Sequence, residues 1–149
     1  MIIESNFSRE GEFPLENVFS RVVFRGKFRS YQQEVLDGSG AYLADGRIHI
    51  VAAPGSGKTV LGLELLRRTG RPTLILSPTV TVRRQWGERF RELFLPEGEA
   101  LEDYFSESLS VPAPVCSITY QALHMASKPD ESGAPQWRKA VREDRKSVV

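Results

Sequence analysis

The chain has 149 residues, of which 40% are apolar and 26% charged, and its formal net charge is +1. This length allows one domain with a core and excludes two of ordinary size. The near-neutral charge excludes a basic field over the whole surface, so any nucleic-acid contact must come from a local face. The single cysteine excludes an intrachain disulfide and favours a cytoplasmic protein, while two distant histidines provide no metal cluster. No apolar stretch is long enough for a membrane span, and the first residues lack the pattern of a signal peptide.

The first half of the chain indicates one strand–turn–helix unit behind a less regular start. In chain order, the predicted elements are a strand over Phe19–Phe24 within a mixed stretch, a helix over Tyr31–Tyr42, a strand over 48–52 and a helix over Lys58–Arg68. Ser30 is the candidate N-cap of the first helix. Gly70 follows the second helix at the position where a left-handed residue commonly ends one.

The second half alternates strands and helices. Its predicted elements are a strand over Thr73–Ser77, an amphipathic helix over Thr81–Phe94, an acidic loop over 96–114, a strand over Pro114–Thr119, a helix over Gln121–Ser127, a polar loop over Lys128–Pro135, a charged helix over Gln136–Lys146 and the start of a strand at Ser147–Val149. The connections are too long for hairpins, so they indicate βαβ units. The predicted fold class is α/β, with a parallel sheet covered by helices on both faces.

The run 52–59, Ala-Ala-Pro-Gly-Ser-Gly-Lys-Thr, has the spacing of a phosphate-binding loop between a strand and a helix. Its glycines let successive N–H groups point at phosphate oxygens, and the helix N-terminus adds its own. Lys58 would contact the β- and γ-phosphates, and the Thr59 hydroxyl would bind Mg²⁺. The candidate nucleotide-binding residues of the loop are Pro54, Gly55, Ser56, Gly57, Lys58 and Thr59. The general pattern asks for glycine where this chain has Ala52, and the alternative is a turn that only resembles the motif.

Three further segments narrow the choice among phosphate-loop proteins. Arg29-Ser30-Tyr31-Gln32 precedes the loop; a glutamine amide can pair with two edge atoms of adenine, and a guanidinium can stack on the base. Ser77-Pro78-Thr79, with Gln85-Trp86 downstream, and Ser117–Leu123 each lead from a strand into threonine, at the end where open α/β sheets bind ligands. Taken alone, the segment Arg29–Gln32 is more simply an ordinary helix start with polar residues at the surface, and each of the other two is equally an ordinary strand-to-helix turn.

In this order and at these spacings, the segments resemble the first motor domain of superfamily 2 helicases and translocases. The likeness is closest to the branch that includes type III restriction-enzyme motor subunits and related DEAH-type helicases, and it covers residues 28–126. It implies a RecA-like P-loop NTPase fold, in which alanine at position 52 is usual. Residues 1–27 would then be an N-terminal extension, and residues 28–149 a part of the motor domain.

The resemblance implies a role for each candidate residue. Arg29 would stack on adenine, Gln32 would read the edge of the base, and the loop would hold ATP with Mg²⁺. A track for one DNA or RNA strand would bind phosphates and sugars. The residues of this track would be Pro78, Thr79, Arg83 and Thr119. For Arg83, a solvated helix face is the simpler alternative.

The catalytic carboxylates of the resembled family are not found in this sequence. The family carries them in Asp-Glu-x-His at the end of an apolar strand, where they hold the metal and position water. Here the one Asp-Glu dipeptide, Asp130-Glu131, lies among turn-forming residues, and Glu143-Asp144 has the wrong order. We therefore expect a chain cut from a longer helicase before that motif, lacking the second motor domain. Alone it should bind nucleotide weakly, hydrolyse none, and self-associate through an exposed sheet edge.

The sequence thus predicts the N-terminal part of an ATP-dependent helicase or translocase whose cofactors are ATP and Mg²⁺. Its partners would be a DNA or RNA strand and the second motor domain, with no membrane involved. Two alternatives stay open. One is a phosphate-loop ATPase that acts without nucleic acid, and the other is a nucleotide-binding module without catalysis.

Overall fold

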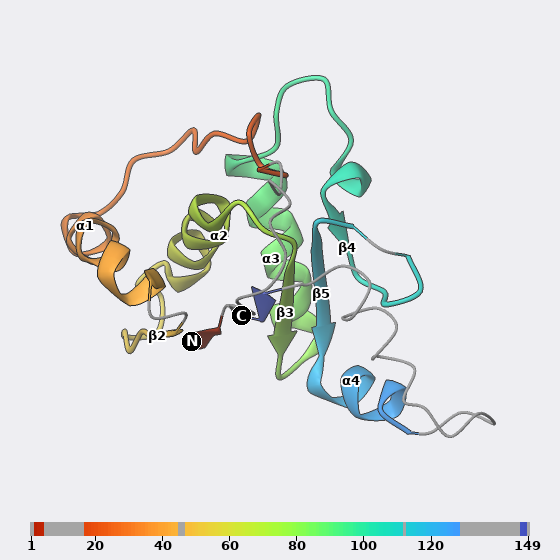
Figure 1. Cartoon of the computed structure of the whole chain (residues 1–149). Coiled ribbons are helices and arrows are strands. Elements are labelled where there is room, and N and C mark those ends of the chain that lie inside the picture. Colours follow the sequence, from red (N-terminus) through yellow and green to blue (C-terminus); the bar gives the residue numbers. More distant parts are fainter. Residues whose placement is uncertain (1, 5–16, 45–46, 112, 129–146, 149) are drawn as a thin grey trace.

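The structure is a computed structural model that describes residues 2–4, 17–44, 47–111, 113–128 and 147–148. Figure 1 labels its helices and strands. They are β1 (Ile2–Glu4), α1 (Ser30–Ala44), β2 (Arg47–His49), α2 (Lys58–Thr69), β3 (Thr73–Ser77), α3 (Val80–Leu93), the 3-10 turn η1 (Leu101–Asp103), β4 (Phe105–Ser106), β5 (Val115–Thr119), α4 (Tyr120–Ala126) and β6 (Ser147–Val148).

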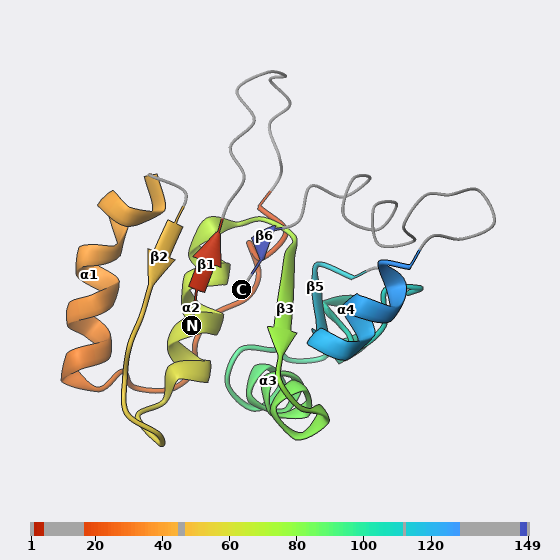
Figure 2. The ribbon, with the colours of Figure 1, turned by 90° about the horizontal axis from the view of Figure 1, so that it is seen from below.

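The strands form one six-stranded sheet in the order β2-β1-β6-β3-β5-β4. Figure 2 shows the first five of these side by side. β6, β3, β5 and β4 run parallel, as predicted, whereas β1 is antiparallel to both of its neighbours, β2 and β6. Because two antiparallel steps restore the direction, β2 runs the same way as β3 and β5. The turns that leave these three strands therefore lie at one edge of the sheet, the edge where open α/β sheets bind ligands.

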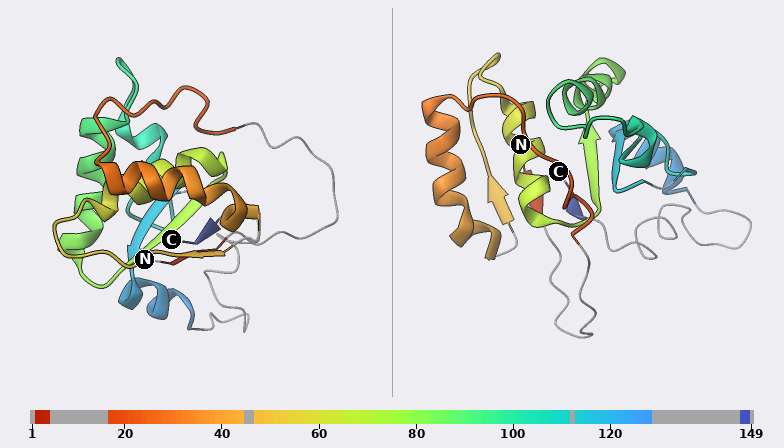
Figure 3. Two further views of the ribbon diagram at one scale, coloured as in Figure 1. Left: turned by 90° about the vertical axis from the view of Figure 1, so that its left-hand side faces the viewer. Right: turned by 90° about the horizontal axis from the view of Figure 1, so that it is seen from above.

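Strand β6 lies inside the sheet and pairs with β3 on one side and with β1 on the other. Ser147 pairs with Thr73 of β3, and Val148 pairs with Leu74 of β3 and with Glu4 of β1. The predicted strand start is thus confirmed over 147–148. β1 lies between β2 and β6. Because β1 pairs with β6, the first and the last described strands lie next to each other, as Figure 3 shows.

The main core fills the face of the sheet that α2 and α3 cover. Ile75 of β3 and Val115 of β5 are completely buried there, together with the leucines of α2. Phe90 of α3 is the centre of an aromatic group. Its ring centroid lies 6.1 Å from Phe94, 5.8 Å from Tyr104 and 6.0 Å from Phe105. This burial of large apolar side chains is the dominant favourable contribution to folding.

A second, smaller core lies on the other face of the same strands. Leu74 of β3 and Cys116 and Ile118 of β5 are buried there and pack with Leu123 of α4. Neighbouring residues of a strand point to opposite faces, so cores on both faces explain why β5 is buried at every position and β3 at all but one. Helices on both faces of a parallel sheet confirm the predicted α/β class.

The ends of α2 and α3 lie within one residue of the predicted ones: α2 ends at Thr69 instead of Arg68, and α3 spans Val80–Leu93 instead of Thr81–Phe94. α2 begins at Lys58 and is closed by Gly70, which has the left-handed φ of 68° that glycine adopts easily. α3 begins at Val80, because the Thr79 side chain accepts a hydrogen bond from the Val82 N–H. Trp86 and Phe90 are its buried residues on the predicted apolar side.

The predicted strand at Phe19–Phe24 is wrong. Asn17 Oδ1 accepts from the Phe19 N–H at 2.9 Å, and the Val22 N–H donates to the Phe19 carbonyl at 3.0 Å, so the chain turns here. Phe19 and Val22 are both buried, whereas Val23 is exposed. Apolar residues three apart fit a turn that covers the core, not the alternation of a strand.

Other boundaries also differ from the prediction. β2 ends at His49 instead of 52, so the approach to the loop is irregular. The acidic stretch 96–114 contains η1 and the short edge strand β4, because Tyr104 and Phe105 bury their rings against Phe90. The predicted loop and helix that follow Lys128, including Asp130-Glu131, lie outside the described residues.

Candidate nucleotide and nucleic-acid site

The loop between β2 and α2 has the backbone conformation of a phosphate-binding turn. Gly55 and Gly57 have positive φ angles of 73° and 92°, which side chains other than glycine rarely adopt. The Ser56 N–H donates to the Ala53 carbonyl at 3.2 Å and closes the turn. Gly57 then caps α2, and its carbonyl accepts from the Leu61 N–H at 3.2 Å. The candidate loop residues therefore lie in one tight turn at the start of α2.

Lys58 lies across this loop and occupies its own carbonyls. Its Nζ donates to the Ala52 carbonyl at 2.6 Å and to the Ala53 carbonyl at 2.8 Å. Only the backbone of Ala52 takes part, so the absence of glycine at this position removes no contact. A nucleotide would have to draw the Lys58 ammonium away from these carbonyls toward its phosphates.

The start of α1 packs against the loop, and Figure 2 shows the chain entering α1 beside the turn between β2 and α2. Three side chains from this segment donate to three consecutive loop carbonyls. The pairs are Arg29 Nη1 to Gly55 O at 3.1 Å, Tyr31 Oη to Ser56 O, and Gln32 Nε2 to Gly57 O at 3.0 Å. Sequence reasoning selected the arginine and the glutamine but missed the tyrosine, whose only signal was its place between them.

Gln32 also fixes the beginning of α1. Its Oε1 accepts from the Arg29 N–H at 2.8 Å, and the Arg29 carbonyl accepts from the Gln33 N–H at 3.0 Å. This is the reciprocal half of a capping box, in which the third helical residue reaches back to the residue before the helix. Arg29 is thus the cap, and the prediction of Ser30 as N-cap is wrong by one residue. Only 3% of Gln32 is exposed, so its amide is fixed in place.

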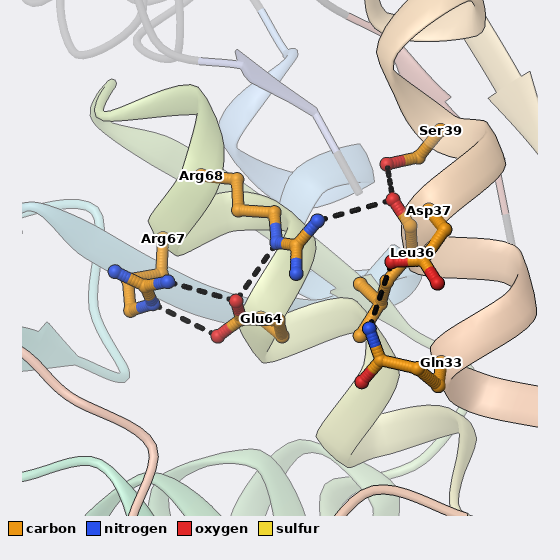
Figure 4. Close-up of polar contacts among 7 residues, drawn as sticks. All are labelled: Gln33, Leu36, Asp37, Ser39, Glu64, Arg67 and Arg68. Atoms are coloured by element: carbon orange, nitrogen blue, oxygen red, sulfur yellow. Dashed lines mark hydrogen bonds and ion pairs between the residues drawn. The ribbon is translucent and has the colours of Figure 1, made fainter. Parts of the chain in front are cut away.

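Helix α2 is fastened to α1 through a buried carboxylate, shown in Figure 4. Glu64 is 2% exposed and accepts hydrogen bonds from Arg67 Nε, Arg67 Nη2 and Arg68 Nε, each at 2.8 Å. Arg68 Nη1 donates to the Leu36 carbonyl of α1 at 3.0 Å, to which Ser39 Oγ also donates at 2.7 Å. The loop and the segment that holds it therefore sit on two helices joined by this cluster.

The negative charge of Glu64 and the positive charges of Arg67 and Arg68 attract one another. Burial raises the pKa of Glu64, but hydrogen bonds and charge from Arg67 and Arg68 outweigh it and hold that pKa below its ordinary value of 4.5. The hydrogen bond to Glu64 raises the pKa of Arg67 despite its partial burial. The two arginines thus favour the charged form of the Glu64 carboxylate despite its burial.

The candidate nucleic-acid residues lie where β3 and β5 end. Thr79 Oγ1 accepts from the Val82 N–H at 3.2 Å, and Thr119 Oγ1 accepts from the Ala122 N–H at 3.1 Å. Because Thr119 pairs in register with Ser77, the ends of β3 and β5 are neighbours, and Pro78 is exposed directly after β3. Both threonines use Oγ1 as an acceptor, which leaves each O–H free to donate to a phosphate oxygen.

Arg83 reaches across to the loop that follows β4. Its Nη2 lies 2.6 Å from Glu107 Oε2, and its buried Nε has no partner within the described residues. The guanidinium is 20% exposed and its carboxylate partner 40%. Arg83, which the sequence analysis assigned to the nucleic-acid track, is therefore paired with the carboxylate of Glu107.

A family model described as "Type III restriction enzyme, res subunit" matches residues 25–148. The chain belongs to this family. The resemblance to the N-terminal motor domain of superfamily 2 helicases is thereby confirmed, together with an incomplete RecA-like P-loop fold. The match includes the segment before α1, the loop, and the ends of β3 and β5.

Three relatives of this res-subunit family member are named UvrABC system protein B. That of Thermus thermophilus is 35% identical over 89 residues, which cover 54% of this chain and 13% of the relative. That of Dechloromonas aromatica is 35% identical over 69 residues, and that of Nitratidesulfovibrio vulgaris 37% over 70 residues; each covers 43% of this chain and 10% of the relative. The chain thus spans about a tenth of the length of these relatives.

Among the described residues, no helix is both long and apolar enough to cross a membrane. The same part of the chain holds no group of three or more acidic, histidine or cysteine side chains that could bind a metal ion.

Proposed function

We propose that this chain is the N-terminal motor part of an ATP-dependent helicase or translocase that moves along DNA or RNA. The observation that carries the proposal is the shared edge of the sheet. The glycine-rich loop follows β2 there, and two threonine-capped strand ends follow β3 and β5. A nucleotide and a nucleic-acid strand would thus bind to neighbouring parts of one edge.

The loop suits a nucleoside triphosphate with Mg²⁺. Within the described residues, the N–H groups of Gly57 and Lys58 have no hydrogen-bond acceptor, so both are available to phosphate oxygens. Lys58 supplies a positive charge, and Thr59 lies in the first turn of α2 with a hydroxyl for the metal. Mg²⁺ commonly takes one or two protein ligands and completes its shell with phosphates and water. Bound there, it would neutralise charge that develops on the phosphates.

The segment before α1 would receive the adenine. The guanidinium of Arg29 is exposed next to the loop and can stack on a base. The Gln32 amide keeps a second N–H and a second lone pair beyond the bonds that it already makes, and these are the groups an adenine edge would use.

Nucleic acid would bind through its backbone at the ends of β3 and β5. The hydroxyls of Thr79 and Thr119 would donate to phosphates, with the exposed Pro78 next to Thr79 and Arg83 adding charge. Such contacts carry no sequence preference, which suits an enzyme that moves along a strand. Closure against a second motor domain would then couple ATP to movement.

ATP binding in the presence of Mg²⁺, measured by isothermal titration calorimetry, tests the nucleotide part. Lys58→Ala should weaken binding by about 10- to 100-fold, because it removes a charge-assisted contact to phosphate. Lys128→Ala removes an exposed lysine beyond the end of α4, away from the loop and the segment before α1, and is the matched control. An unbound wild-type chain, or equal binding by both variants, would contradict the proposal.

Turnover separates the helicase from its alternatives. The chain alone should release no phosphate from ATP, because the sequence holds no Asp-Glu-x-His; turnover that Lys58→Ala abolishes would overturn this expectation. In a protein that joins this chain to a second motor domain, single-stranded DNA or RNA should stimulate hydrolysis. Hydrolysis without stimulation would favour another ATPase, and binding without hydrolysis a nucleotide-binding module.

A further inference from the structure

The peptide between Ser56 and Gly57 needs a restraint from outside the loop. Gly57 has a φ of 92°, and glycine adopts positive and negative φ with similar ease. The loop backbone therefore does not by itself decide which way this peptide faces. Yet the peptide is planar and trans, so its C=O and its N–H point in opposite directions. Whatever holds the Ser56 carbonyl also sets the direction of the Gly57 N–H.

In the described part of the chain, the Tyr31 hydroxyl is the one donor to the Ser56 carbonyl. It lies on the side of the loop that faces α1, so the Gly57 N–H is turned away from α1. That N–H has no acceptor among the described residues. It is the kind of backbone donor that binds a phosphate oxygen at a glycine-rich turn.

The neighbouring carbonyls depend less on side chains from α1. The Gly57 carbonyl accepts from the Leu61 N–H as well as from Gln32, so α2 holds it even without the amide. The Gly55 carbonyl is held by Arg29, whose contact is exposed, and water can replace an exposed donor. The Tyr31 contact is partly buried and has no substitute.

We propose that Tyr31 is a positioning residue for phosphate binding. Its hydroxyl holds the Ser56 carbonyl toward α1 and so presents the Gly57 N–H to a phosphate group. The proposal rests on the proposed nucleotide site and adds to it a residue that does not touch the ligand. The ring of Tyr31 is not needed for this task; the hydroxyl is.

Tyr31→Phe removes that hydroxyl and keeps the ring. With Mg²⁺ present, we expect it to weaken binding of both ATP and inorganic tripolyphosphate by about tenfold, and to leave adenosine binding unchanged. Tyr120→Phe removes an exposed tyrosine hydroxyl at the start of α4 and should change none of these affinities. Tyr31→Phe should lower the unfolding midpoint, because the Ser56 carbonyl loses its donor, whereas Tyr120→Phe should not; binding is compared at a temperature at which both variants are folded. Equal affinity of wild type and Tyr31→Phe for both phosphates would overturn the proposal.

A second measurement tests the positioning role of Tyr31 independently of nucleotide binding. In the ligand-free protein, NMR couplings and nuclear Overhauser effects of Gly57 report its φ and the direction of the Ser56–Gly57 peptide. We expect Tyr31→Phe to change these signals and Tyr120→Phe to leave them. If the wild type bound neither phosphate, the proposed function would fail while the NMR comparison still decided Tyr31. Unchanged Gly57 signals in Tyr31→Phe would overturn its positioning role.

Discussion

The phosphate loop and the ends of β3 and β5 lie at the same edge of the sheet but are built in different ways. The loop is held by side chains that come 25 and 26 residues earlier in the chain. Each strand end is held by one threonine, which accepts from a backbone N–H three residues later. One region is thus assembled by contacts between distant segments, and the other by a local hydrogen bond that occurs twice.

This difference determines how far a substitution acts. A change in a local cap affects one helix start, because both partners of the hydrogen bond belong to the same turn. A change in the loop or its supports affects α1, α2 and the turn together, because their contacts share residues. We therefore expect larger effects on stability and ligand binding in the loop region than at the strand ends.

The largest effect should come from the cluster that joins α1 and α2. Glu64→Gln keeps the size of the side chain but removes its charge, and charge-assisted hydrogen bonds are about twice as strong as neutral ones. The side chains of Arg67 and Arg68 are 31% and 33% exposed, so solvent screens part of the attraction. We expect a loss of about 2 kcal/mol in the free energy of unfolding at pH 7, measured by urea denaturation.

The pH dependence of Glu64→Gln has a definite sign. Since folding lowers the pKa of Glu64, its carboxylate stabilises the folded state above its ordinary pKa of 4.5, and this contribution is lost as the pH falls through the folded pKa. The gap between wild type and Glu64→Gln should therefore narrow in acid. Glu92→Gln removes a 55% exposed carboxylate from a similar pair with Arg89 and is the matched control. Equal losses in both variants would mean that burial adds nothing to the Glu64 cluster.

The next effect compares the two loop glycines. Alanine at either position is strained by a positive φ, at about 1 kcal/mol. At Gly57 a Cβ would also come within 2.7 Å of Gln32 Nε2 and disturb its hydrogen bond, whereas at Gly55 it would meet nothing within 4 Å. Gly57→Ala should thus lose about 2 kcal/mol of unfolding free energy, and Gly55→Ala about half of that. Equal losses would show that the α1 segment does not restrain the loop.

The regions that the sequence predicted well are those with local signals. β3 carries a continuous apolar run of strand length, and Gly70 ends α2 through its own backbone conformation. The order of motifs also identified the family. In each case the information lies within a few neighbouring residues, or in motif spacings that a family preserves.

The parts that sequence reasoning missed depend on distant contacts. Nothing near Tyr31 indicates that its hydroxyl meets Ser56, because that contact needs α1 to be packed beside α2. Tyr104 and Phe105 lie in an acidic stretch that resembles a loop, and only the ring of Phe90 on another element explains their burial. Local composition cannot report a partner supplied by another part of the fold.

A smaller effect should appear at the strand ends. Thr79→Ala and Thr119→Ala each remove one helix cap, which should lower the free energy of unfolding by about 1 kcal/mol. Both should also weaken binding of single-stranded nucleic acid, since each removes a hydroxyl donor. Thr→Ser at the same positions keeps the oxygen and should restore stability and binding together. If serine restored stability alone, the methyl group and not the hydroxyl would be the contact to the strand.

The smallest effect on stability, and the sharpest test of the nucleic-acid edge, concerns Arg83 and Glu107. Because both side chains are partly exposed, breaking their 2.6 Å pair should change the free energy of unfolding by about 0.5 kcal/mol. A phosphate and Glu107 would compete for the same guanidinium. Glu107→Gln should therefore tighten binding of single-stranded DNA a few-fold, while Arg83→Gln weakens it and lowers the salt slope by about one. Glu102→Gln removes an equal charge from the same stretch without releasing Arg83. If Glu102→Gln tightened binding as much as Glu107→Gln, the gain would reflect net charge, and Arg83 would have no role in the track.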